Sequence, residues 1–106
     1  MRNSLVVYTV RTTFPDETTR DRYVDWLRGG HCLAVVREGG ALSAEVTVQE
    51  DGSVESRYLF GSRGDYDAYV DGPAVDLRAE YSRLFPLSSG VRAERSVGIR
   101  AVRVPD

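Results

Sequence analysis

Alternating hydrophobic and polar residues along the chain predict four β-strands, at residues 4–13, 41–49, 54–61 and 91–104. In the first of them Val6, Tyr8 and Val10 share one face at a period of two, and β-branched residues, which favour strands, are frequent. The alternation continues longest in the last segment, so we expect a long C-terminal strand there.

The second and third strands are expected to form a hairpin. The Asp51-Gly52 pair between them is typical of a tight turn. In this hairpin Glu45 and Arg57 lie on the more polar face, where opposite charges on neighbouring strands stabilise each other. We therefore expect these two side chains to pair.

Apolar residues at helical spacing predict a helix after the first strand. It follows two acidic residues, Asp16 and Glu17, which favour a helix N-terminus, and Gly29-Gly30 is expected to stop or bend it. Residues 31–38 then fit either a second short helix or a strand, because eight residues are too few for the period to decide.

The strongest helical pattern lies in the second half of the chain. Ser62 and Asp65 have the spacing of a capping box, and apolar residues recur every three or four positions from Tyr66 to Leu84. Pro73 removes a backbone donor inside this pattern, so we expect a kink or break close to it, near residues 71–72.

The resulting order, β-α-(α)-β-β-α-β, predicts a ferredoxin-like α+β sandwich: a four-stranded antiparallel sheet with helices on one face. The first strand also places Leu5 and Val7 on the face opposite Val6, so both sheet faces are expected to be apolar. With 106 residues the chain is long enough for one domain, residues 1–106, but too short to cover both faces. We therefore expect a homodimer in which two sheets close face to face, a dimeric α+β barrel.

Composition narrows the classes of partner and location. The chain is 42% hydrophobic and 28% charged, as globular domains are, and no apolar run suits a membrane span or a signal peptide. All 14 basic residues are scattered arginines and the net charge is −2, which argues against nucleic acid or a membrane as partner and excludes a Schiff-base lysine. The lone Cys32 excludes an internal disulfide and suits the cytoplasm.

His31 is the candidate catalytic residue, because its side chain alone has an ordinary pKa near neutrality. It follows a Gly-Gly break, where a helix meets a loop. The alternative is a structural histidine that caps the helix end. One histidine beside one cysteine, Cys32, makes no recognisable set of metal ligands, so we expect no metal.

Four further residues are candidates for binding a small organic molecule. Trp26 is either core or one wall of a pocket with His31 at its rim. Six tyrosines against three phenylalanines suit a half-polar cavity that includes Tyr58 and Tyr66, although amphipathic helices and a dimer seam explain the same count. Arg57 either belongs to the hairpin ion pair or orients an anionic group.

Three short motifs follow one another along the chain: Trp-Leu-Arg-Gly-Gly-His at residues 26–31, Tyr-Leu-Phe-Gly-Ser at 58–62 and Asp-Tyr-Asp-Ala-Tyr at 65–69. With the strand order, they resemble a family of small uncharacterised bacterial proteins in the dimeric α+β-barrel superfamily. The resemblance spans nearly the whole chain and implies the fold and the dimer, but no activity. The family pattern has a second histidine where this chain has Tyr81, so a site that needs two histidines would lack one here.

The wider superfamily is similar in fold to antibiotic-biosynthesis monooxygenases, heme-degrading oxygenases, muconolactone isomerases and polyketide cyclases. Such proteins commonly use a cleft between sheet and helices, often without a metal or organic cofactor. The resemblance therefore implies a small-molecule-binding protein, either a cofactor-independent enzyme of isomerase, cyclase or monooxygenase type or a non-catalytic regulatory or assembly module. Heme binding or degradation is a third, weaker alternative.

Overall fold

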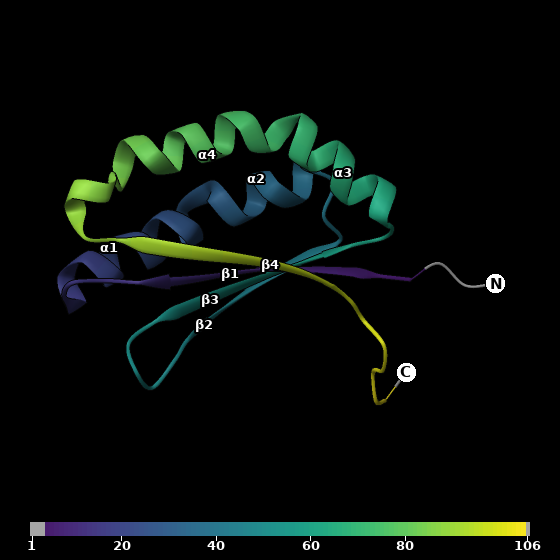
Figure 1. Ribbon diagram of the computed structural model, residues 1–106, viewed down its shortest axis with the longest axis horizontal. Helices are drawn as coiled ribbons and strands as arrows, with labels where there is room; N and C mark the ends of the chain where they lie inside the picture. Colours follow the sequence, from purple (N-terminus) through teal and green to yellow (C-terminus); the bar gives the residue numbers. More distant parts are fainter. Residues whose placement is uncertain (1–3, 106) are drawn as a thin grey trace.

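The computed structural model describes residues 4–105. These residues form one sheet with all helices on one of its faces (Figure 1). The first three residues of the segment considered for a signal peptide lie outside the described residues. The elements in chain order are β1 (Val6–Thr13), α1 (Glu17–Trp26), a π-helical turn η1 (Leu27–His31), α2 (Cys32–Arg37), β2 (Ser43–Val48), β3 (Val54–Phe60), α3 (Arg63–Asp71), α4 (Pro73–Leu84), a short 3-10 helix η2 (Leu87–Ser89) and β4 (Arg92–Ile99).

The sheet confirms the predicted ferredoxin-like fold. Its strands lie in the order β2-β3-β1-β4, and every neighbouring pair is antiparallel. None of the described helices is long and apolar enough to cross a membrane. All described helices lie on one side of the sheet, so its opposite face is uncovered (Figure 1).

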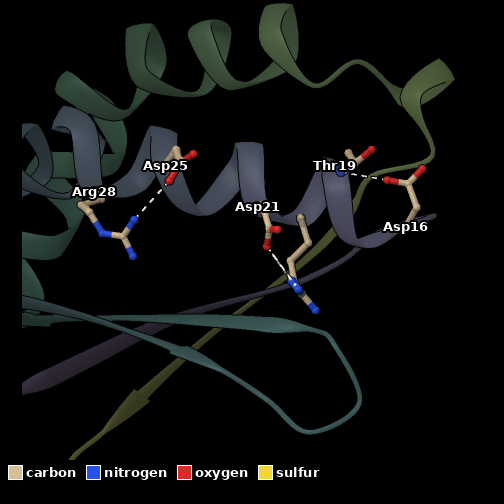
Figure 2. A network of polar contacts seen from close by, with 6 residues as sticks. Asp16, Thr19, Asp21, Asp25 and Arg28 are labelled. Atoms are coloured by element: carbon tan, nitrogen blue, oxygen red, sulfur yellow. Dashed lines mark hydrogen bonds and ion pairs between the residues drawn. The ribbon is translucent and has the colours of Figure 1, made fainter.

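Both long helical segments begin at side-chain caps. The Asp16 carboxylate accepts a hydrogen bond from the backbone nitrogen of Thr19 at 2.8 Å, as Figure 2 shows beside the surface ion pairs of α1. The Ser62 hydroxyl accepts one from the backbone nitrogen of Asp65 at 3.1 Å, as the capping pattern predicts. The expected break is confirmed too: α3 ends at Asp71, and Pro73 opens α4, where a missing N–H costs nothing.

The structure decides two open alternatives for the helices and shortens one predicted strand. Within residues 31–38, left open between helix and strand, Cys32–Arg37 form the helix α2. The Gly29-Gly30 pair bends the chain: α1 and α2 meet at a kink within η1, where Gly30 leaves helical dihedral angles (φ 160°, ψ −22°). The last strand is shorter than predicted: β4 ends at Ile99, because its partner β1 begins at Val6, opposite that residue.

The helix-facing side of the sheet carries the core, as the alternation in β1 predicts. Val6, Tyr8, Val10 and Thr12 are buried there. The buried residues form two clusters. The members of the larger are Val6, Tyr8, Val10, Val35, Ala41, Tyr58, Phe60, Tyr66, Tyr69 and Ala74, and those of the smaller are Tyr23, Leu27, Val54, Phe85 and Val91.

The opposite face of the sheet is mostly polar, so the expectation of two apolar faces is wrong. Cross-strand partners share a face, and the outward rows read Ser43–Leu59–Val7–Gly98, Glu45–Arg57–Thr9–Ser96 and Thr47–Glu55–Arg11–Glu94. Apolar residues at the start of β1 led to the expectation of an apolar face, but the other three strands contribute mostly polar residues to it. Glu45 and Arg57 are cross-strand neighbours, as expected, but these two described side chains form no ion pair.

Candidate functional site

A small cavity of about 30 Å³ lies between the helices and the sheet, where residues of the two core clusters meet. It has room for about one water molecule, far less than the roughly 300–1,000 Å³ of an ordinary ligand pocket. Aromatic rings dominate its walls, and charged groups are few. Its lining residues are Tyr8, Val10, Tyr23, Trp26, His31, Tyr58, Tyr69, Leu77, Arg78, Tyr81 and Arg95.

A larger surface groove of about 530 Å³ lies on the outer side of the same wall. It runs between the segment from Trp26 to Glu38 and the start of α4, and it is bordered by three carboxylates, those of Glu38, Asp76 and Glu80. Trp26, His31 and Leu77 line both the groove and the cavity. These three side chains therefore form the wall that separates the two spaces.

The wall is held by a stack of Trp26 on His31. Their ring centroids are 4.1 Å apart with the planes inclined by 24°, and the Trp26 indole Nε1 donates a hydrogen bond to the Glu80 carboxylate at 2.9 Å. Residues five apart point about 140° away from each other in an α-helix. The kink at Gly30 within η1, spanned by a bond from the Cys32 N–H to the Leu27 carbonyl, brings the two rings to one side.

Burial determines the charge of His31. It lowers the pKa of His31 to about 4, and the Glu80 carboxylate only partly opposes it. The buried Nδ1 atom has no hydrogen-bond partner. At neutral pH the imidazole is therefore uncharged and a weak base while the wall is closed. The catalytic role of His31 stays a prediction.

The tyrosines present uncharged hydroxyl groups to the cavity. Burial raises the pKa of Tyr23 and of Tyr69 to about 12 each, and it raises the pKa of Tyr58 as well. The Cys32 sulfur lies 3.7 Å from the Tyr58 hydroxyl, and burial raises the pKa of that thiol, which disfavours a thiolate. The Tyr8 ring stacks on Tyr58 with centroids 5.8 Å apart.

Two arginines that line the cavity, Arg78 and Arg95, were not identified as site residues from the sequence. Arg95 Nε and Arg78 Nη2 donate hydrogen bonds to the Tyr8 hydroxyl at 3.1 Å and 3.4 Å. A signal was available for each. Arg95 shares the alternation of Val97 on the helix-facing side of β4, and Arg78 follows Leu77 directly within the apolar pattern of α4.

The structure brings together three of the five candidate site residues. Trp26, His31 and Tyr58 line the cavity. Tyr66 lies behind it, with its ring centroid 5.4 Å from that of Tyr8. Arg57 is on the opposite sheet face, in a surface hollow of about 470 Å³. Among residues 4–105, no group of three or more His, Cys, Asp or Glu side chains is placed to hold a metal ion.

Known proteins resemble this chain in structure but not in sequence. No protein-family model and no curated protein matches the sequence. Among solved structures, the chain is similar to a dimeric ferredoxin-like protein from an uncultured marine organism, with a TM-score of 0.79, 14% identity and coverage of 96% of this chain and 100% of that one.

Two oxygenases of Streptomyces have the same fold. The monooxygenase from the gene ActVA-Orf6 of Streptomyces coelicolor, in complex with nanaomycin D, gives a TM-score of 0.69 at 23% identity, over 97% of this chain and 94% of that one. SnoaB, a cofactor-independent oxygenase from Streptomyces nogalater, gives 0.70 at 11% identity, over 96% and 98%. The chain therefore shares its ferredoxin-like fold with these three proteins.

The buried state of His31 predicts an acid-shifted titration. His31 is the only histidine, so its ring signals in NMR spectra can be followed alone, and we expect a midpoint near pH 4. Because the ordinary pKa of about 6.5 applies to the unfolded chain, that state takes up more protons between pH 6.5 and 4, and stability is lost as the pH falls through this window.

A His31→Phe variant keeps a stacked ring without a titrating group. Between pH 7.5 and 5 it should lose less unfolding free energy than the wild type, by on the order of 1–2 kcal/mol, as measured by urea denaturation. A midpoint of His31 near pH 6.5, or equal losses in the two proteins, would contradict the burial of an uncharged imidazole.

Proposed function

We propose that this protein is a homodimer that binds a small aromatic organic molecule between its helices and its sheet. The cavity carries this proposal. Protein interiors normally pair their polar atoms, yet His31 Nδ1, Ser56 Oγ and Arg78 Nε are buried without partners, and two of the three belong to cavity-lining residues. A bound molecule that offers polar groups between aromatic walls would satisfy them.

The ligand enters from the surface groove when the wall moves. The groove has the volume of an ordinary ligand pocket, and the residues that it shares with the cavity are Trp26, His31 and Leu77. The hinge for this movement is Gly29-Gly30 in η1, where the space beside both α-carbons is open. An opened wall also hydrates His31, which raises its pKa toward the ordinary value and makes it a better base.

The two oxygenases with this fold favour a reaction at this site, the cofactor-independent oxygenation of an electron-rich aromatic substrate. Without a cofactor, the substrate supplies all the electrons. An activated CH2 group and O2 give a C=O group and water, with one oxygen atom in each product. His31 accepts the proton that leaves the CH2 group, and the Tyr8 hydroxyl stabilises the resulting enolate oxygen.

The uncovered sheet face and the apolar end of β4 support the proposed homodimer. Val97 and Ile99 are 40% and 65% exposed, and Val102 and Val104 in the following tail are 77% and 86% exposed. The polar rows of the outer face carry both charge signs, which lets two copies related by a two-fold axis pair opposite charges. The marine ferredoxin-like protein of this fold is described as dimeric.

The binding proposal predicts that nanaomycin D quenches the fluorescence of Trp26, the only tryptophan, in a saturable manner. Val10→Phe fills the cavity and should weaken binding at least tenfold, whereas Val48→Phe, at a half-exposed position on the same sheet face outside the cavity, should not. Leu77→Phe is the second cavity-filling variant if Val10→Phe fails to fold. Unsaturable quenching, or equal affinity in cavity-filling variants and control, would refute the site.

The oxygenation proposal predicts O2 consumption above the uncatalysed rate when 1,8-dihydroxyanthrone, which has an activated CH2 group, is added under an oxygen electrode. His31→Ala should lower the enzymatic part at least tenfold, because a positioned base contributes about 10²–10⁴ in rate. Trp26 quenching by nanaomycin D, measured in parallel, shows whether the cleft is intact. Unchanged turnover in His31→Ala would rule out this base.

The dimer proposal predicts a mass of twice the 11.8-kDa chain in light scattering at micromolar concentration. Ile99→Asp should shift the mass toward the monomer, because it puts a charge into the apolar end of β4. Leu33→Asp, at a similarly exposed position on α2, should leave the dimer intact. A monomeric wild type is incompatible with the proposal.

A further inference from the structure

The Tyr8 hydroxyl group has an unusual set of partners. Arg95 Nε and Arg78 Nη2, from β4 and α4, both donate to its single oxygen atom, at 3.1 Å and 3.4 Å. A hydroxyl oxygen has two lone pairs, so both are in use and the O–H hydrogen is left to donate elsewhere. Tyr8 itself is 3% exposed, and it lines the cavity.

No carboxylate balances these two positive charges in the described part of the chain. Arg11, Arg20, Arg28 and Arg63 each form an ion pair with an aspartate, but neither cavity arginine does. A second atom of Arg78, its Nε, is buried with no hydrogen-bond partner. Two like charges that share one neutral acceptor repel each other, and a bound anion would reduce that repulsion.

The surroundings indicate what kind of anion fits. The Arg95 guanidinium lies over the Tyr81 ring, 5.8 Å from its centroid, and its N–H groups other than Nε can donate to a ligand in the guanidinium plane. The two guanidinium groups with the Tyr8 O–H offer several donors to one point, which suits a group with two anionic oxygens. Trp26 lines the same cavity, and its indole ring suits packing against the aromatic ring of a ligand.

We propose that Arg78, Arg95 and Tyr8 bind the carboxylate of an aromatic acid whose ring lies against Trp26. This inference rests on the proposed ligand cleft and adds the charge of its ligand. The competing location is the hollow on the outer sheet face, where Arg57, Arg100 and Arg103 are found. That hollow also contains the Glu45 carboxylate, which offsets part of its positive charge.

The experiment compares 2-naphthoate with 2-naphthamide, which has the same rings and no charge, by titration calorimetry at pH 7.5. The wild type should bind the acid at least tenfold more tightly than the amide. In the Arg78→Gln/Arg95→Gln double variant the two affinities should agree within about twofold. Arg37→Gln, at an exposed position at the end of α2, removes the same kind of charge elsewhere and should keep the preference.

The remaining variants separate the possible failures. Arg95→Gln alone, at an exposed position of β4, replaces the double variant if the latter does not fold, and it should reduce the preference at least threefold. Equal binding of acid and amide by the wild type overturns the anion site but leaves the aromatic cleft in place. A preference that survives the double variant and disappears in Arg57→Gln moves the site to the outer face. Binding of neither probe overturns the cleft and the anion site together.

Discussion

The stack of Trp26 on His31 is the interaction on which the rest of the site depends. It separates the cavity from the surface groove and keeps the imidazole Nδ1 buried. The kink at Gly30 within η1 places the two rings on one side, and the hydrogen bond from Trp26 to Glu80 connects them to α4. The local geometry of five residues thereby sets the volume and the charge state of the cleft.

This closed arrangement leaves polar groups without partners. His31 is held uncharged, and the two cavity arginines share the oxygen of one neutral phenol. Buried polar groups without partners cost about 1–3 kcal/mol each, and such costs are tolerated where function requires them. The aromatic core around the cavity, with Tyr8 against Tyr58, Tyr66 and Tyr69, supplies the packing that offsets them.

Sequence periodicity was sufficient for the fold, because strand and helix periods differ and the caps at Asp16 and Ser62 are local signals. It was insufficient for the site. The kink at Gly30 brings together Trp26 and His31, which a continuous α-helix would place on opposite sides, and an arginine on an apolar face is easily assigned to solvent. Arg57 shows that residue type alone does not identify a site residue. An arginine suits an anion site, but the strand alternation places Arg57 on the outer sheet face, away from the cavity.

The central claim is that a ligand opens the Trp26–His31 wall and occupies the space between helices and sheet. A crystal structure of the protein soaked with 2-naphthoate tests it most directly. The account predicts the naphthalene ring beside Trp26, the carboxylate at Arg78 and Arg95, and the two stacked rings moved apart from their present 4.1 Å separation. Naphthoate bound at Arg57 on the outer sheet face, with the stack unchanged, would contradict it.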